Sequence, residues 1–149
     1  MTARSTLLSP ARVEWSIRIA FAVVYIWFGA LKLADVSPVH DLVRQTLLWL
    51  PDVSYSLLGA GEIVLGLAFL IPRLTKPTVV AFLVHIGGTM LPLFFQQQLS
   101  FNEPPLMLSF IGQYIIKNLV FLAAAAALWS LREEVDLESS VDGQRRKGQ

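Results

Sequence analysis

The sequence contains no cysteine and few charged residues. The absence of cysteine excludes disulfides, thiol catalysis, iron–sulfur ligation and thiolate zinc sites. Lys, Arg, Asp and Glu make up 15% of the chain, whereas soluble domains contain roughly 25%. The net charge of +1 gives no indication of a nucleic-acid partner, and we expect none. The sequence also lacks a glycine-rich phosphate loop, a nucleophile triad and a cluster with the spacing of metal ligands, so we expect no metal site.

Apolar residues are abundant instead, at 54% of 149 residues, with a mean hydropathy of +0.57. A soluble domain of this size could not bury so much apolar surface, so the lipid bilayer is the expected solvent. Four apolar segments, at 15–33, 55–71, 78–95 and 113–131, approach the roughly 20 residues that span a bilayer as a helix. They predict an all-α membrane protein, a bundle of four transmembrane helices over residues 15–131.

The first apolar segment could also be read as a signal peptide, because it follows arginines near the N-terminus. It is longer than the usual apolar core of roughly 7–15 residues, and no clear small-residue cleavage site follows it. It also contains Tyr25, Trp27 and Phe28. We therefore interpret it as a retained membrane helix.

Two connections carry structure of their own. Between the first two helices, Ser37-Pro38 is a helix start signal, and the apolar spacing that follows as far as Leu50 predicts a short amphipathic helix on the membrane surface or capping the bundle. Between helices 3 and 4, alternating residues around Pro104-Pro105 predict an outer hairpin-like flap over residues 96–112. Gly87-Gly88 and Pro92 predict a kink in the third helix.

Basic residues in the short flanks predict the orientation. They lie in the N-terminal region, in the turn after the second helix and in the tail: Arg4, Arg12, Arg18, Arg73, Lys76, Arg132, Arg145, Arg146 and Lys147. The other side has only Arg44. Both termini should therefore be cytoplasmic, with residues 1–14 as a flank and residues 132–149 as a disordered, charged tail.

Ionisable residues within the apolar segments are costly and mark candidate sites. Lys32, Glu62 and Lys117 come to similar outer depths, and His85 lies near mid-membrane, at about 1.5 Å per residue. Each shares its helix face with small or polar residues, which predicts that the faces converge on a polar pocket open toward the outer side. The candidate ligand-binding residues are Lys32, Glu62, Lys117, His85, Asn118, Tyr114, Trp27 and Gln113.

The pocket charge allows several interpretations. Two lysines oppose one glutamate, which leaves +1 when His85 is neutral. One lysine could have a lowered pKa, one could snorkel to headgroups, or an anionic or electron-rich ligand could bind. Equally, Lys32 and Glu62 could form a purely structural pair, and His85 could serve packing alone. A bis-histidine haem is not expected, because the other histidine, His40, lies in the outer connection.

Three motifs carry a family resemblance. Residues 27–32, WFGALK, resemble the first-helix signature of the DoxX-like membrane proteins, and residues 62–67, EIVLGL, are similar to their second-helix motif. Residues 112–119, GQYIIKNL, resemble the fourth-helix start of the YkgB-type branch. Many relatives have an aspartate where this chain has Asn118, so a potential partner for Lys117 is missing.

The resemblance implies a four-helix bundle in a bacterial or archaeal cytoplasmic membrane. Relatives include a subunit of a thiosulfate:quinone oxidoreductase and proteins tied to oxidative or chlorine stress. Thiosulfate chemistry does not carry over, because no sulfur-handling cysteine is present. No cofactor is firmly implied, although a quinone would fit, and whether the protein is an enzyme stays open.

Three functional hypotheses follow. The first is a quinone- or small-molecule-binding component of a redox or oxidative-stress system. Lys32 and Lys117 would donate to a carbonyl, Glu62 would position Lys32, and His85 could relay a proton. Trp27, Phe28 and Tyr114 would flank the ring. The alternatives are a small proton or anion transporter and a non-catalytic assembly subunit. A membrane or cytoplasmic redox partner protein and a homo-oligomer are both compatible with the sequence.

Overall fold

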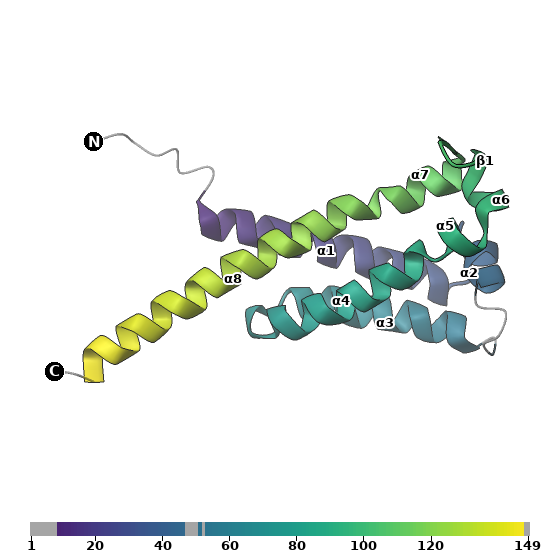
Figure 1. Cartoon of the computed structure of the whole chain (residues 1–149). Helices are drawn as coiled ribbons and strands as arrows, with labels where there is room; N and C mark the ends of the chain where they lie inside the picture. The colour runs from purple at the N-terminus through teal and green to yellow at the C-terminus, as the bar shows by residue number, and fades with distance from the viewer. Residues whose placement is uncertain (1–8, 47–50, 52, 148–149) are drawn as a thin grey trace.

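The computed structural model describes residues 9–46, 51 and 53–147 of the chain, and these residues form mainly helices (Figure 1). In chain order the elements are α1 (Pro10–Leu33), α2 (His40–Thr46), α3 (Val53–Phe69), the 3₁₀ helix η2 (Pro72–Leu74), α4 (Thr75–Met90), α5 (Pro92–Phe95), α6 (Gln97–Ser100), β1 (Phe101–Glu103), β2 (Met107–Leu108), α7 (Phe110–Ile116) and α8 (Asn118–Lys147).

Three stretches of helix are long and apolar enough to cross a membrane: Pro10–Leu33, Pro72–Phe95 and Phe110–Val135. Helix α3 is apolar but shorter, at 17 residues. The protein is therefore an all-α, multi-pass membrane protein. Its helices run between two ends of the molecule (Figure 1). We call the end with α2, α5, α6 and β1 the hairpin end, and the end where α1 begins and α8 finishes the termini end.

Helices α1 and α3 pack against each other along a row of glycines. A Cβ on Gly29 would collide with the backbone oxygen of Gly59, and a Cβ on Gly59 would lie 2.9 Å from the Cβ of Lys32. Farther along, a Cβ on Gly66 would lie 3.1 Å from the backbone oxygen of Ala22. Small residues allow this close backbone approach, which is how membrane helices gain packing contacts. The glycine row also turns Glu62, on the same face of α3, toward α1.

Aromatic rings fill the bundle between the glycine row and the termini end. The rings of Phe21 and Phe69 stack with their centres 4.3 Å apart, and the Phe82 ring meets Phe21 edge-on at 5.1 Å. Phe69 and Phe82 are fully buried, as are Ala125 and Leu128 of α8. These contacts join α1, α3, α4 and α8 in one core.

Arg18 lies beneath this core, completely buried. Its Nη1 donates to the backbone oxygen of Phe69 at 2.9 Å, and its Nη2 donates to Oγ1 of Thr75 at 2.6 Å. Glu14, one turn earlier in α1, forms an ion pair with Nη2 at 2.6 Å. The guanidinium thus connects α1 to the turn between α3 and α4. Arg18, which the sequence analysis used only to predict the orientation in the membrane, therefore also holds the helices together.

Two apolar segments are interrupted. The sequence predicts a kink in the outer half of the third helix from Gly87-Gly88 and Pro92, and the structure ends α4 at Met90 and begins α5 at Pro92. A second interruption was not predicted: α7 ends at Ile116 and α8 begins at Asn118. At this point the backbone N–H of Lys117 donates to Gln113 at a long 3.4 Å.

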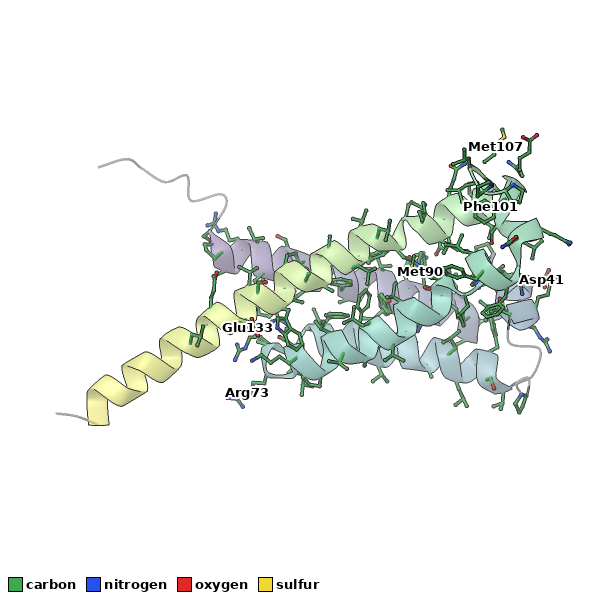
Figure 2. All side chains as sticks on the ribbon, in the orientation of Figure 1. Asp41, Arg73, Met90, Phe101, Met107 and Glu133 are labelled. Carbon is green, nitrogen blue, oxygen red and sulfur yellow. The ribbon has the colours of Figure 1, made fainter. Side chains whose placement is uncertain are left out.

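The hairpin end closes through short elements. Strands β1 and β2 pair antiparallel, with Phe101 opposite Leu108. Ser109 caps α7 by accepting from the backbone N–H of Gly112, and its own hydroxyl donates to the backbone oxygen of Leu99. Figure 2 shows Phe101 and Met107 at this end, with Asp41 of α2, and Arg73 and Glu133 toward the opposite one.

Two expectations about helix ends differ from the structure. The amphipathic helix predicted from Ser37-Pro38 begins at His40 and is seen to Thr46, while residues 47–50 of the prediction lie outside the described residues. The tail predicted to be disordered from Arg132 continues α8 to Lys147. Extending an existing helix costs far less than nucleating one, and this stretch contains no proline to stop it.

Candidate functional site

A buried ion pair joins α1 to α3 above the aromatic core. The Lys32 ammonium donates to both carboxylate oxygens of Glu62, at 2.9 Å to Oε1 and 2.7 Å to Oε2. Lys32 is 6% exposed and Glu62 is 5% exposed. Buried charges require such pairing, because an isolated charge in an apolar interior is far more costly. The pairing predicted from the sequence is therefore present in the structure.

His85 brings a third helix to the same carboxylate. Its Nε2 lies 3.3 Å from Oε1 of Glu62, and its ring meets the Tyr25 ring edge-on at 5.4 Å. Imidazole can donate from one nitrogen and accept at the other, so His85 can exchange a proton with a neighbour while keeping its place. Three helices, α1, α3 and α4, thus meet at Glu62.

A cavity of about 480 Å³ adjoins this cluster. Its size lies within the usual range of roughly 300–1,000 Å³ for small-molecule sites. Most of its lining is apolar. The lining residues are Val24, Tyr25, Phe28, Lys32, Val39, Leu42, Val43, Thr46, Leu58, Glu62, His85, Ile86, Gly88, Thr89, Leu91, Pro92, Tyr114, Ile115, Lys117, Asn118, Val120 and Phe121.

Lys117 reaches the cavity from the interruption between α7 and α8. Its Nζ lies 5.0 Å from the centre of the Tyr114 ring, within the range of a cation–π interaction. Within the described part of the chain Lys117 forms no ion pair. The cavity lining contains two lysines and one glutamate, and Glu62 is paired with Lys32. Beside Lys117, Nδ2 of Asn118 donates to Oγ1 of Thr89 at 2.9 Å, which links α8 to α4.

The structure brings six of the eight predicted site residues to the cavity and leaves out Trp27 and Gln113. Trp27 is 65% exposed on the outer face of α1, because five residues separate it from Lys32, a rotation of about 140° from the Lys32 face. Gln113 is exposed and its Nε2 lies 3.5 Å from the backbone oxygen of Leu108. The described cavity lining therefore does not include these two residues.

Several lining residues were missed by the site prediction. Four come from α2 and the residue before it: Val39, Leu42, Val43 and Thr46. Their helical spacing had indicated an apolar face, but the sequence left open whether that face met lipid or the bundle. Thr89 was also missed, although it lies four residues after His85 and therefore on the same face of α4.

The geometry defines a class of protein: a membrane-embedded helical bundle with an apolar cavity and a buried charged cluster. The family model for DoxX matches residues 15–97, which is 83 of the 149 residues. The chain therefore belongs to the DoxX family. The match covers Lys32, Glu62 and His85 but not Lys117. Neither a curated protein nor a solved structure matches the chain.

Within the described residues no group of three or more His, Asp or Glu side chains is placed to hold a metal ion. The polar groups that line the cavity are two ammonium groups, an imidazole, two phenols, an amide, two threonine hydroxyls and one carboxylate, and the rest of the lining is apolar. Such a set suits a neutral or anionic organic head with oxygen acceptors.

Proposed function

We propose that this DoxX-family protein binds a quinone, or a small molecule of similar shape, as a component of a redox or oxidative-stress system in the membrane. The observation that supports the proposal is the cavity, whose apolar walls hold Lys32, Glu62, His85 and Lys117 together. A quinone needs an apolar slot for its ring and hydrogen-bond donors for its two carbonyl oxygens. The cavity offers both.

The residues present fit such a head. Lys32 has three N–H donors and directs bonds to the two oxygens of Glu62, which leaves one N–H for a ligand oxygen. Lys117, which also lines the cavity, would supply a second cationic donor. Tyr114 and Phe28, whose ring centres lie 6.2 Å apart, offer aromatic faces to a ring.

A bound quinone would supply two-electron, two-proton redox chemistry. The chain's own residues would hold and orient it. Glu62 fixes the Lys32 ammonium, and His85, 3.3 Å from the Glu62 carboxylate, can hold a proton beside the ligand. The net positive charge of the cluster favours ligand forms that carry negative charge on oxygen.

Two features favour binding over permeation. The cavity lining begins at Val24 in α1, and the rings of Phe21, Phe69 and Phe82 fill the bundle from there toward the termini end. A close-packed aromatic layer leaves little room for a path that would conduct a proton or anion. We therefore do not favour the transporter alternative. In the proposed function, the protein binds its ligand and works with a redox partner protein.

The proposal also includes the membrane arrangement. Helix α3, at 17 residues, reaches about 25 Å and would cross as the fourth span, since transmembrane helices range down to roughly 17 residues. The hairpin of β1 and β2 would form an outer flap of a bacterial or archaeal cytoplasmic membrane protein of the YkgB-type branch. The termini end, with Arg73, Lys76 and Arg132, would face the cytoplasm.

Ligand titration tests the function. Wild-type protein in lipid nanodiscs would be titrated with decylubiquinone by calorimetry, in parallel with the Lys117→Met and Lys76→Met variants. A hydrogen bond to a charged group contributes about 1.5–3 kcal/mol, so Lys117→Met should weaken binding roughly tenfold or more. Lys76→Met removes the same charge outside the cavity and should bind like the wild type.

Two results would contradict the function. If the wild-type protein shows no saturable binding of decylubiquinone, the ligand class is wrong. If Lys117→Met binds as well as Lys76→Met, the cavity is not where the ligand lies.

A further inference from the structure

Exposure is distributed unevenly around the cavity lining. Of the 22 described residues that line it, eighteen are buried or partly buried. The exposed ones all lie along the line where α4 faces the junction of α7 and α8: Gly88, Leu91, Lys117 and Val120. The cavity therefore meets the surroundings between α4 and α8.

The described residues close the other sides of the cavity. Toward the termini end the aromatic core of Phe21 and Phe69 fills the bundle. Along α1 and α3 the backbones touch at Gly29 and Gly59. Toward the hairpin end, α2 covers the cavity with partly buried side chains, and Pro92 and Ile115 are buried.

The surface around the exposed edge is apolar. Phe94, Phe95, Ile116 and Leu119 are all exposed there. Lys117 lies seven residues into the span that begins at Phe110, about 10 Å along the helix axis, and hydrocarbon extends across about 30 Å of a bilayer. The edge therefore faces lipid and not the aqueous phase.

Among the residues that the structure describes, one side-chain hydrogen bond crosses this edge. Asn118 of α8 donates to Thr89 of α4, between Gly88 and Val120 on one side and Leu91 and Lys117 on the other. A single hydrogen bond contributes about 0.5–1.5 kcal/mol, so it can open and close readily.

We propose that the cavity has a lateral portal between α4 and α8, and that its ligand is a lipid-soluble amphipath that enters from the bilayer. The head lies against Lys32, Glu62 and Lys117, while the hydrocarbon tail passes between Gly88 and Val120 into lipid. The bond from Asn118 to Thr89 latches the portal. This inference rests on the proposed function and adds the route and the class of ligand.

Gly88 and Gly87 provide a matched pair for the test. A Cβ on either glycine would meet nothing within 4 Å, so both sites accept a larger side chain. Only Gly88 lines the cavity. Gly88→Leu places an isobutyl group in the portal, whereas Gly87→Leu places the same group on the neighbouring lipid-facing surface and changes helix propensity equally.

The experiment measures exchange rates of decylubiquinone by stopped flow with protein in liposomes. Gly88→Leu should slow association and dissociation several-fold, with a smaller change in Kd because both rates fall. Gly87→Leu should match the wild type. Thr89→Val removes the latch without adding bulk, so it should speed both rates several-fold.

The outcomes separate the two proposals. If the wild type binds decylubiquinone but Gly88→Leu and Thr89→Val both exchange ligand at the wild-type rates, the portal is wrong and the proposed function stands. If the wild type shows no saturable binding, both are overturned. Size-exclusion profiles of the variants establish that each is folded, and Thr89→Val keeps the test decisive should Gly88→Leu fail to fold.

Discussion

Burying the ion pair of Lys32 and Glu62 between α1 and α3 costs free energy. Removing two charges from water costs several kcal/mol per ion, and the mutual attraction offsets this only with good geometry and further hydrogen bonds. Here both carboxylate oxygens accept from Lys32, and Oε1 also faces Nε2 of His85. Such a pair contributes little net stability, but removing one partner leaves the other charge buried and unpaired. The loss of stability in such a variant is a structural effect, distinct from any effect on ligand binding.

Stability measurements on single and double variants resolve that effect. Lys32→Met leaves the buried Glu62 carboxylate without its cationic partner and should lower the free energy of unfolding by about 3 kcal/mol. Lys32→Met combined with Glu62→Met removes both charges and should recover most of the loss. Denaturant titration in mixed micelles measures both. Lys117→Met, at an exposed lysine, is the control and should change stability little; equal losses in the single and double variants would contradict the pairing argument.

Single residues also set the limit of sequence reasoning. Charges in apolar segments are rare enough to be picked out, so Lys32, Glu62, His85 and Lys117 were predicted as site residues and all four line the cavity. Arg18 was assigned to a flank because it stands near the segment start, and only the fold shows that it is buried against Phe69 and Thr75. Burial depends on what packs opposite, which one helix's sequence does not contain.

At the scale of the elements, α1 and α3 form the platform that positions the site. Their contact depends on Gly29, Gly59 and Gly66, where backbone meets backbone. The motif WFGALK contains Gly29 and EIVLGL contains Gly66, so the residues that carry the family resemblance include those that bring Lys32 within reach of Glu62. The contact that packs α1 against α3 therefore also brings the residues of the site together.

A pair of glycines in α3 tests this platform. A Cβ on Gly59 would lie 2.9 Å from the Cβ of Lys32, whereas a Cβ on Gly61 would meet nothing within 4 Å. Gly59→Leu should force the helices apart and lower the free energy of unfolding by about 2 kcal/mol, since overpacking typically costs 1–3 kcal/mol. Gly61→Leu should leave stability unchanged or slightly raised. Thermal unfolding in detergent measures both, and equal midpoints would show that the close approach is not required.

Elements were predictable to the extent that their signals are local. The kink at Pro92 follows from a missing N–H and a ring clash, so the sequence predicts it. The interruption at Lys117 involves no proline or glycine, and the sequence gives no local signal for it. In the tail, charge density suggested disorder, but α8 continues through these residues because nothing in them ends a helix.

At the scale of the whole molecule, the termini end and the hairpin end differ from each other in their residues and in their secondary structure. The first described residues of α1 and the last of α8 lie at one end, with Arg73 and Glu133 near them, and Phe101 and Met107 lie at the other (Figure 2). The lengths of the apolar segments predict a membrane protein from sequence alone, and the family match and the helices of the structure agree with this prediction. The direction of insertion depends on the basic residues of the flanks and is the part of the proposal that labelling can decide.

The absence of cysteine makes that labelling direct, because any single introduced thiol is unique. Asn102→Cys places a thiol on the exposed hairpin, and Glu134→Cys places one on the exposed surface of α8 near the termini end. With the termini end in the cytoplasm, a membrane-impermeant maleimide should label Asn102→Cys in intact cells and Glu134→Cys only after permeabilisation. The cysteine-free wild type gives the background. The reverse pattern would place the hairpin end inside the cell and contradict the orientation expected from the basic residues.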